Sequence, residues 1–327
     1  AASDVYKRQL VHSAAAAKTG STDIRAWLAR RQQTPGTDWS PTVHEPATDG
    51  LASAHVPPLG LSNRAVEGAS EVAAFTKPPN PEQLQSLTLW PEMEKLYGHG
   101  YELLSVAMDT NTHMIASTCK ASTPAHAVVR LFDAQHRFEP AKDALEGHTL
   151  SITRVAFSPC GTYLLTVSRD RSWRMFRRTP SGYVAWIGER AHARIVWDGA
   201  WAPHSRMFAT ASRDKSVKIW TLVDDAQRPY RLVTTLNASD AVVSVTWASD
   251  GALAMGLENG DVWLYTCARD GTWQLHTTLA RHHTGPVHRV ACRPQGRWMD
   301  AYDRVPYQLL SVGDDGCTRL VSWYIDP

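Results

Sequence analysis

The sequence predicts an all-β fold, a propeller of repeated four-stranded sheets, and three observations support this prediction. A unit of about 45 residues recurs from residue 97 to the C-terminus. A Gly-His or Ala-His pair opens the first three copies and His282-His283 the fifth, and histidines 99, 148, 192 and 283 are separated by 49, 44 and 91 residues, the last being two periods. Each copy then holds an alternating apolar strand, a small-residue strand ending in Ser-x-Asp, and a strand closing on an aromatic residue. Such self-similarity is typical of WD40-type β-propellers, which usually bind rather than catalyse.

Five repeats can be placed along residues 98–327. The second and third show the pattern most plainly, with Ser-Arg-Asp turns at 168–170 and 212–214. The fourth is degenerate, because Ser239-Asp240 replaces its opener, and the fifth carries an insertion, Arg297 to Pro306, between its first two strands. We expect the repeats to span residues 98–133, 147–176, 191–220, 239–265 and 282–323.

The chain therefore predicts about five full blades plus part of another. We expect a partial blade and a Pro-rich linker in residues 56–97, because the strand before a Gly-His opener normally belongs to the preceding blade. The fifth repeat ends at a third strand, so we expect its outer strand to come from elsewhere in the protein. Residues 1–55 are rich in Ala, Thr, Pro and Ser, which predicts an irregular or disordered segment. Residues 4–9 match a translated sequencing-adaptor end, so residues 1–9 are a candidate artefact.

Composition narrows the function. The net charge is +2, which predicts no global attraction to nucleic acid or to a membrane, and we expect no membrane partner. No run of 18 apolar residues occurs, which argues against a transmembrane helix. The five cysteines are scattered, without a Cys-x-x-Cys pair, which favours a reducing compartment. We predict a cytoplasmic location, with the nucleus as a further one.

The His, Ser and Asp residues suggest a hydrolase at first sight, but their spacing argues for a structural role. Histidine, serine and aspartate recur at the same offsets in the second and third repeats, whereas a catalytic triad is needed once. We predict a buried network in which the opener histidine bonds the turn aspartate through one ring nitrogen and a strand Ser or Thr through the other. Its expected members are His148, Ser168, Asp170, His192, Ser212, Asp214 and Trp220, whose indole would bond the hydroxyl.

No catalytic, metal-binding or cofactor-binding residue is predicted. His282 and His283 are adjacent, so we expect them to point to opposite faces and not to chelate one ion. No glycine-rich nucleotide-binding motif occurs. We therefore expect no metal and no cofactor.

Charged residues beside the network are the candidate binding site. Opener loops and second-to-third-strand turns share one rim of a propeller, so cations there would form a band across neighbouring blades. Two interpretations stay open: a solvated rim, or a docking patch for an acidic protein segment or, weakly, for RNA phosphate. The predicted rim cations are Arg154, Arg169, Arg171, Arg194, Arg213 and Lys215.

Several segments resemble the Elongator complex protein 2 family of WD40-repeat scaffold subunits. The most specific are Leu89-Trp90-Pro91-Glu92 and the following Lys95-Leu96-Tyr97-Gly98-His99-Gly100-Tyr101-Glu102. Residues 59–66, 116–121, 167–173 and 211–220 are similar to the same family, so the resemblance covers roughly residues 56–327. It implies a C-terminal fragment, taken from the second of two seven-bladed propellers.

The resemblance further implies a non-catalytic scaffold in a complex that modifies wobble uridines of tRNA. Its partners would be other Elongator subunits, namely the large scaffold subunit and the acetyltransferase subunit, which holds the chemistry. An alternative is another WD40 adaptor, such as a ubiquitin-ligase substrate receptor, which would usually carry a recruitment helix or box outside the propeller. A propeller enzyme is a third reading, and it would need acidic or metal-binding residues converging on the central channel.

Overall fold

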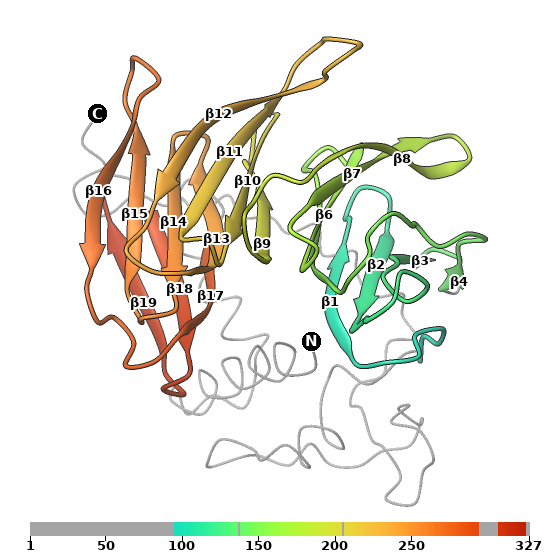
Figure 1. Ribbon diagram of the computed structural model, residues 1–327, viewed down its shortest axis with the longest axis horizontal. Helices are drawn as coiled ribbons and strands as arrows, with labels where there is room; N and C mark the ends of the chain where they lie inside the picture. Colours follow the sequence, from blue (N-terminus) through green and yellow to red (C-terminus); the bar gives the residue numbers. More distant parts are fainter. Residues whose placement is uncertain (1–94, 137, 205, 294–306, 325–327) are drawn as a thin grey trace, which may run out of the picture. The chain divides into compact units, whose positions relative to one another are not determined.

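The computed structural model describes residues 95–136, 138–204, 206–293 and 307–324, and this part of the chain is built from β-strands (Figure 1). Five antiparallel sheets follow one another along the sequence, and within each sheet the strands keep their sequence order. The innermost strand of each sheet contacts the innermost strand of the next. The predicted WD40-type propeller with five blades is therefore confirmed. The predicted segment 1–55 lies outside the described residues, and so does the predicted segment 56–97 up to residue 94.

The first two blades are complete four-stranded meanders. Blade one contains β1 (Leu103–Met108), β2 (Met114–Cys119), β3 (Arg130–Asp133) and β4 (Glu139–Pro140). Blade two contains β5 (Ile152–Phe157), β6 (Tyr163–Ser168), β7 (Trp173–Thr179) and β8 (Gly182–Glu189).

The remaining blades follow the same plan, and the last shows three strands within the described residues. Blade three contains β9 (Val196–Trp201), β10 (Met207–Ser212), β11 (Ser216–Leu222) and β12 (Tyr230–Asn237). Blade four contains β13 (Val242–Ser249), β14 (Ala252–Leu257), β15 (Val262–Cys267) and β16 (Trp273–Leu279). Blade five contains β17 (Val287–Cys292), β18 (Tyr307–Gly313) and β19 (Thr318–Trp323) in the described residues. None of these elements is a helix, so the described residues hold no helical span fit for a membrane.

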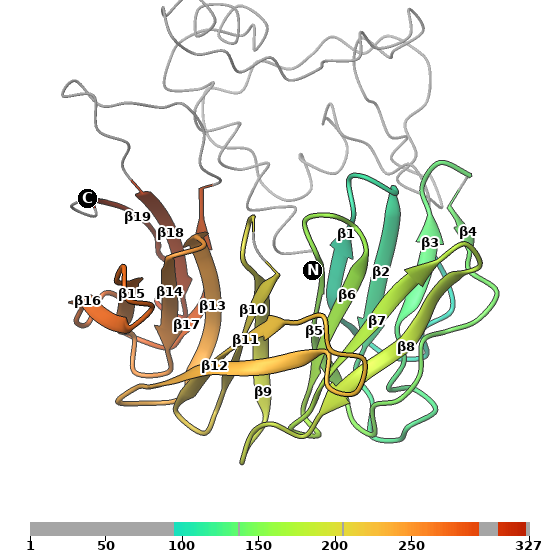
Figure 2. The same ribbon diagram turned by 90° about the horizontal axis from the view of Figure 1, so that it is seen from above.

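The core consists of apolar clusters between successive sheets, which stand as layers in Figure 2. Blades two and three meet through Trp173, whose ring centroid lies 5.0 Å from that of Phe208 and 5.5 Å from that of Trp220. Blades four and five meet so closely that a Cβ added to Gly256 would lie 2.5 Å from a methyl of Val287. The small residues predicted for the second strands therefore let neighbouring sheets approach.

Every inner strand is interrupted by a register shift at the same point. In each inner strand, the residue that comes directly after the shift is polar or charged. A bulge re-aims the side chain that follows it, so five equivalent side chains share one orientation. These inner-strand residues are Ser105, Arg154, Asp198, Ser244 and Arg289.

The closing aromatic of blade five differs from the sequence-based assignment. Phe176 pairs with Leu164 and Trp220 pairs with Phe208, but the equivalent register in blade five pairs Leu309 with Val321. Trp323 lies two residues further along β19 and stacks on Tyr307, with ring centroids 5.3 Å apart. Taking Trp323 as the closing residue therefore placed the end of the blade-five repeat two residues too far along the chain.

Candidate functional site

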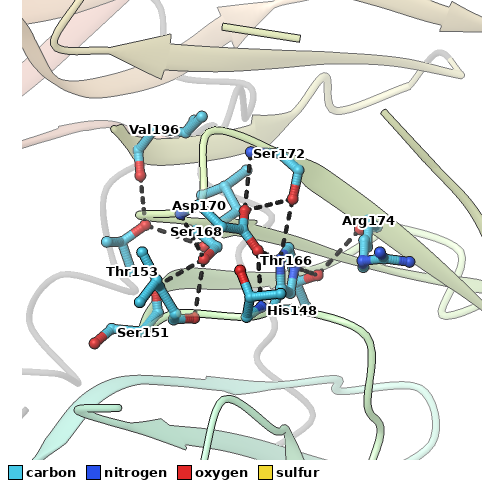
Figure 3. Close-up of polar contacts among 12 residues, drawn as sticks. His148, Ser151, Thr153, Thr166, Ser168, Asp170, Ser172, Arg174 and Val196 are labelled. Atoms are coloured by element: carbon cyan, nitrogen blue, oxygen red, sulfur yellow. Dashed lines mark hydrogen bonds and ion pairs between the residues drawn. The ribbon is translucent and has the colours of Figure 1, made fainter. Parts of the chain in front are cut away.

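The opener histidine of blade two is the centre of a buried polar network (Figure 3). The His148 ring bonds the Asp170 carboxylate through Nδ1 at 2.9 Å and the Thr166 hydroxyl through Nε2 at 2.9 Å. The loop before β5 brings the histidine, β6 the threonine, and the β6–β7 turn the aspartate. The network thus joins the opener loop to the neighbouring turn and to the middle of the sheet.

Asp170 accepts more than the histidine bond. The backbone N–H groups of Thr149 and Ser172 donate to its carboxylate at 3.1 and 3.0 Å, and the Ser172 hydroxyl donates as well. Burial opposes ionisation, but the hydrogen bond and charge of His148, together with these donors, hold the pKa of Asp170 well below its usual range. The carboxylate is therefore ionised throughout the neutral range.

Blade three repeats the arrangement. His192 bonds Asp214 at 3.0 Å and the Thr210 hydroxyl at 2.9 Å. Here the indole N–H of Trp220 also donates to the Thr210 hydroxyl at 3.1 Å, which Phe176 of blade two has no group to do. Burial again opposes ionisation of Asp214, and the bonds from His192 and Ser216 outweigh it, so its pKa is also lowered.

Blades one and five hold variants of the same set. In blade five, His283 bonds Asp315 and the Ser311 hydroxyl, both at 2.9 Å, and Arg319 donates to Asp315 at 2.7 Å. In blade one, His99 bonds the Ser117 hydroxyl at 2.8 Å. The arrangement therefore recurs with graded completeness.

Burial limits the chemistry of these groups. The residues His148, His192 and His283 are 2%, 5% and 1% exposed. Both nitrogens of each ring already form a hydrogen bond. A general base must reach the proton that it removes, which such a ring cannot do without opening the blade. What the arrangement can do is fix two loops of one rim against the sheet.

The serines of the predicted network have a different partner from the one expected. Ser168 donates its hydroxyl to the carbonyl groups of Leu150 and Ser151 and accepts the Asp170 N–H at 3.1 Å. Ser212 does the same in blade three with Arg194 and Ile195. They shape the turn but do not contact the histidine. Thr166 and Thr210 do, and the signal was present, because residues i and i+2 of a strand share one face.

The predicted rim cations fall into two groups. Arg169, Arg171, Arg194 and Arg213 are exposed, and within the described part of the chain their side chains form no ion pair. The backbone N–H of His192 donates to the Arg171 carbonyl, so the blade-two turn lies beside the blade-three opener. Lys215 differs, since its ammonium pairs with Asp240 at 3.3 Å and bonds the Ser239 carbonyl. We call the four exposed arginines the arginine rim.

Arg154 does not belong to that rim, which corrects the sequence-based assignment. It lies on the inner strand β5, and its Nε is 3.5 Å from the Asp198 carboxylate of blade three. Arg289 of blade five also bonds Asp198, at 3.0 Å to each oxygen, and Ser244 donates to it at 2.8 Å. Asp198 is 1% exposed, and these three side-chain partners come from three other blades. Sequence reasoning missed it, although a lone aspartate within an apolar inner strand is a signal.

Metal binding can be assessed for the described residues only, and none of their His, Cys, Asp and Glu side chains form a group of three suited to a metal ion. The expectation that His282 and His283 point to opposite faces is wrong. Both rings reach the Ser311 hydroxyl, at 3.0 and 2.9 Å, and their centroids are 5.1 Å apart. The loop conformation before β17 allows this, because strand alternation does not apply to it.

Comparison with known proteins agrees with the geometry. The family model for the WD domain, G-beta repeat, matches residues 140–177 and 188–221, which cover most of the first three strands of blades two and three. Elongator complex protein 2 of Schizosaccharomyces pombe is 35% identical over 83% of this chain and 38% of the relative. The Saccharomyces cerevisiae protein of the same name is 36% identical over 69% and 32%, and the Homo sapiens one 30% identical over 82% and 39%. The match thus spans between 32% and 39% of the length of these relatives.

Proposed function

This chain is a homologue of Elongator complex protein 2 with WD40 repeats, and on that premise we propose that it is a non-catalytic scaffold of the Elongator complex. In this role it supports wobble-uridine modification of tRNA by holding other subunits, the large scaffold subunit and the acetyltransferase subunit, in place. The proposed location is the cytoplasm, with the nucleus as a further one.

One observation carries the non-catalytic part of the proposal. The His–Asp–hydroxyl set has nearly the same distances in blades two, three and five, and its histidines are buried in all three. A repeated buried set satisfies polar groups that would otherwise be costly to bury. It therefore supports loop positioning rather than bond breaking.

The arginine rim is the proposed docking surface. Arg169 and Arg171 of blade two lie next to the blade-three opener loop, which carries Arg194, and the following turn carries Arg213. Guanidinium groups that keep their donors free bind carboxylates in a bidentate manner. An acidic segment of a partner subunit fits this surface, and RNA phosphate is the alternative ligand that the experiment must separate.

The test is affinity purification of the tagged protein from cells, with identification of the proteins that accompany it. Reversing Arg169, Arg171 and Arg213 to glutamate should weaken recovery of Elongator subunits at least about tenfold, a loss of roughly 1.4 kcal/mol in binding. A matched control reverses Lys142, Arg231 and Arg269, which are exposed and lie outside the rim.

Three outcomes decide the proposal. Unchanged recovery with the rim variant leaves the rim as a solvated surface. Loss of recovery that nuclease treatment of the wild type reproduces assigns the rim to RNA. Recovery of ubiquitin-ligase components in place of Elongator subunits favours the alternative adaptor.

A further inference from the structure

The rim opposite the histidine network contains a cavity between blades two and three. Its volume is about 350 Å³, at the lower end of ligand pockets (~300–1,000 Å³), which is room for one side chain rather than a cofactor. The walls are the β5–β6 turn, the start of β6, the end of β9 and the end of β11. The lining residues are Ser158, Pro159, Cys160, Tyr163, Trp201, Pro203, His204, Arg206 and Leu222. We call it the blade two–three pocket.

One wall of the pocket is part of a stack of aromatic rings. Tyr163 lies between Trp186 and Trp201, with centroid distances of 5.1 and 6.2 Å and interplanar angles of 17° and 21°. The guanidinium of Arg177 lies over the Trp186 ring, 5.8 Å from its centroid. Aromatic pairs also form edge to face, so a further ring can meet Tyr163 and Trp201 in this way, and the wall suits an aromatic occupant.

The polar groups of the lining are largely used within the protein. The indole N–H of Trp201 donates to the Ala156 carbonyl at 3.1 Å. The Ser158 hydroxyl accepts the Tyr163 N–H at 3.0 Å, and the His204 N–H donates to Asp250 at 3.0 Å. These indole, hydroxyl and backbone groups are therefore not free to bond the edge of a nucleobase, and the pocket favours an apolar ring.

The mouth of the pocket is basic. Arg206 lines the pocket, and Arg177 lies beside it, since Arg177 pairs with Tyr163 across the strands. Asp224 pairs with Arg206 at 2.8 Å, but its side chain is 86% exposed, so a ligand carboxylate can compete for the guanidinium. Charge complementarity therefore calls for an acidic neighbour to the aromatic anchor.

We propose that the blade two–three pocket binds one aromatic side chain of an acidic segment in a partner protein. This inference rests on the proposed scaffold function and adds a second docking surface on the rim opposite the arginine rim. Proline-, tryptophan- and tyrosine-lined hollows with a charged margin are typical of such anchor sites.

Cys160 provides a direct readout of occupancy. Desolvation raises the pKa of its thiol, but hydrogen bonds with Ser158 and Thr162 outweigh this, so the pKa is lowered and the exposed thiol reacts readily. Cys317, the other exposed cysteine, lies in blade five and serves as an internal control. The rates of alkylation of both thiols can be followed by mass spectrometry of the full chain.

The probes are a capped Trp-Glu dipeptide, its Trp-Lys counterpart and uridine monophosphate. We expect millimolar Trp-Glu to slow alkylation of Cys160 at least about threefold, the effect of about two-thirds occupancy, and to leave Cys317 unchanged. The Trp-Lys dipeptide should protect weakly. Equal protection by both dipeptides, no protection, or stronger protection by the nucleotide overturns the proposal.

Variants separate this proposal from the proposed function. Arg206→Glu should remove the preference for Trp-Glu, whereas Arg269→Glu, an exposed arginine in a blade-four turn, should retain it. An Arg206→Glu chain that keeps the preference contradicts the assignment. If wild-type Cys160 is protected while Elongator subunits fail to co-purify, the pocket stands and the proposed function fails.

Discussion

Blades two and four place different chemistry at the same positions of one fold. Strand register aligns Met255 with Thr166, since Met255 pairs with Trp263 as Thr166 pairs with Arg174. At the turn, Asn259 takes the place of Asp170, and Ser239-Asp240 takes the place of the Gly-His opener. Blade four therefore fills with apolar groups the space that blade two fills with a hydrogen-bonded network.

A blade can therefore fill this part of its interior with the polar network or with apolar side chains, and the fold does not require the network. Met255 is fully buried, and it belongs to the apolar cluster that joins blades three and four. What differs is the rim: the blade-four opener carries Asp240, which pairs with Lys215, whereas the blade-two turn presents unpaired arginines. The network thus determines how the opener loop and the turn are held at the rim, where a partner would bind.

Replacing Met255 by threonine should disrupt the apolar packing of blade four and have the largest effect on stability. The change removes a buried side chain and leaves a hydroxyl without a histidine partner, so the free energy of unfolding should fall by about 3–5 kcal/mol. Urea unfolding followed by tryptophan fluorescence measures it. Met255→Val, which has the same shape as threonine, isolates the hydroxyl, and equal losses for Val and Thr would contradict the argument.

Removing the network aspartate should have the next largest effect. Asp170→Ala leaves the buried ring donor of His148, and the backbone donors of Thr149 and Ser172, without their acceptor, which should lower the free energy of unfolding by about 1–3 kcal/mol. The matched change in blade four is Asn259→Ala, whose side chain bonds only its own turn, and we expect a loss below about 0.5 kcal/mol. Similar losses at both positions would remove the distinction between the two blades.

Acid should act on the network and spare the apolar blade. The pKa values of Asp170 and Asp214 are lowered in the folded protein, so their stabilisation is fully present above the unfolded value of about 3.9 and is lost as the pH falls below it towards the folded value. The urea midpoint should therefore begin to drop near about pH 4 and should keep falling as the pH is lowered further. The double variant Asp170→Asn, Asp214→Asn should show a shallower drop, and parallel curves would count against the network.

Much of the fold could be predicted because the repeat is carried by local residue types. Openers, alternation and turn residues recur, so blade number and order follow from the sequence, and so do the His148–Asp170 and His192–Asp214 pairings. The inner-strand bulges could not be predicted, since a register shift depends on how neighbouring sheets pack. Arg154 was therefore assigned to the rim, although its guanidinium faces Asp198 of another blade.

The blade two–three pocket likewise could not be predicted from the sequence. Its walls come from turns and strand ends of two blades, and nothing in the spacing of Tyr163, Trp186 and Trp201 indicates that their rings stack. Aromatic residues in repeats are more often core, as Trp173 and Trp220 are. Contacts between repeats, rather than within them, are the part that periodicity does not encode.

The smallest expected effect tests the difference between the two polar blades themselves. Trp220→Phe converts the blade-three network to the blade-two form by deleting the indole donor to Thr210 while keeping an aromatic ring. Thr210 would still bond His192, so no buried group loses its last partner, and the free energy of unfolding should fall by only about 1 kcal/mol. Trp220→Leu, which also removes the ring packed against Trp173, should cost more, and its urea midpoint provides the scale. If Trp220→Phe cost as much as Trp220→Leu, the indole hydrogen bond would be essential to the blade-three network, and Phe176 in blade two would require an explanation beyond the loss of one donor.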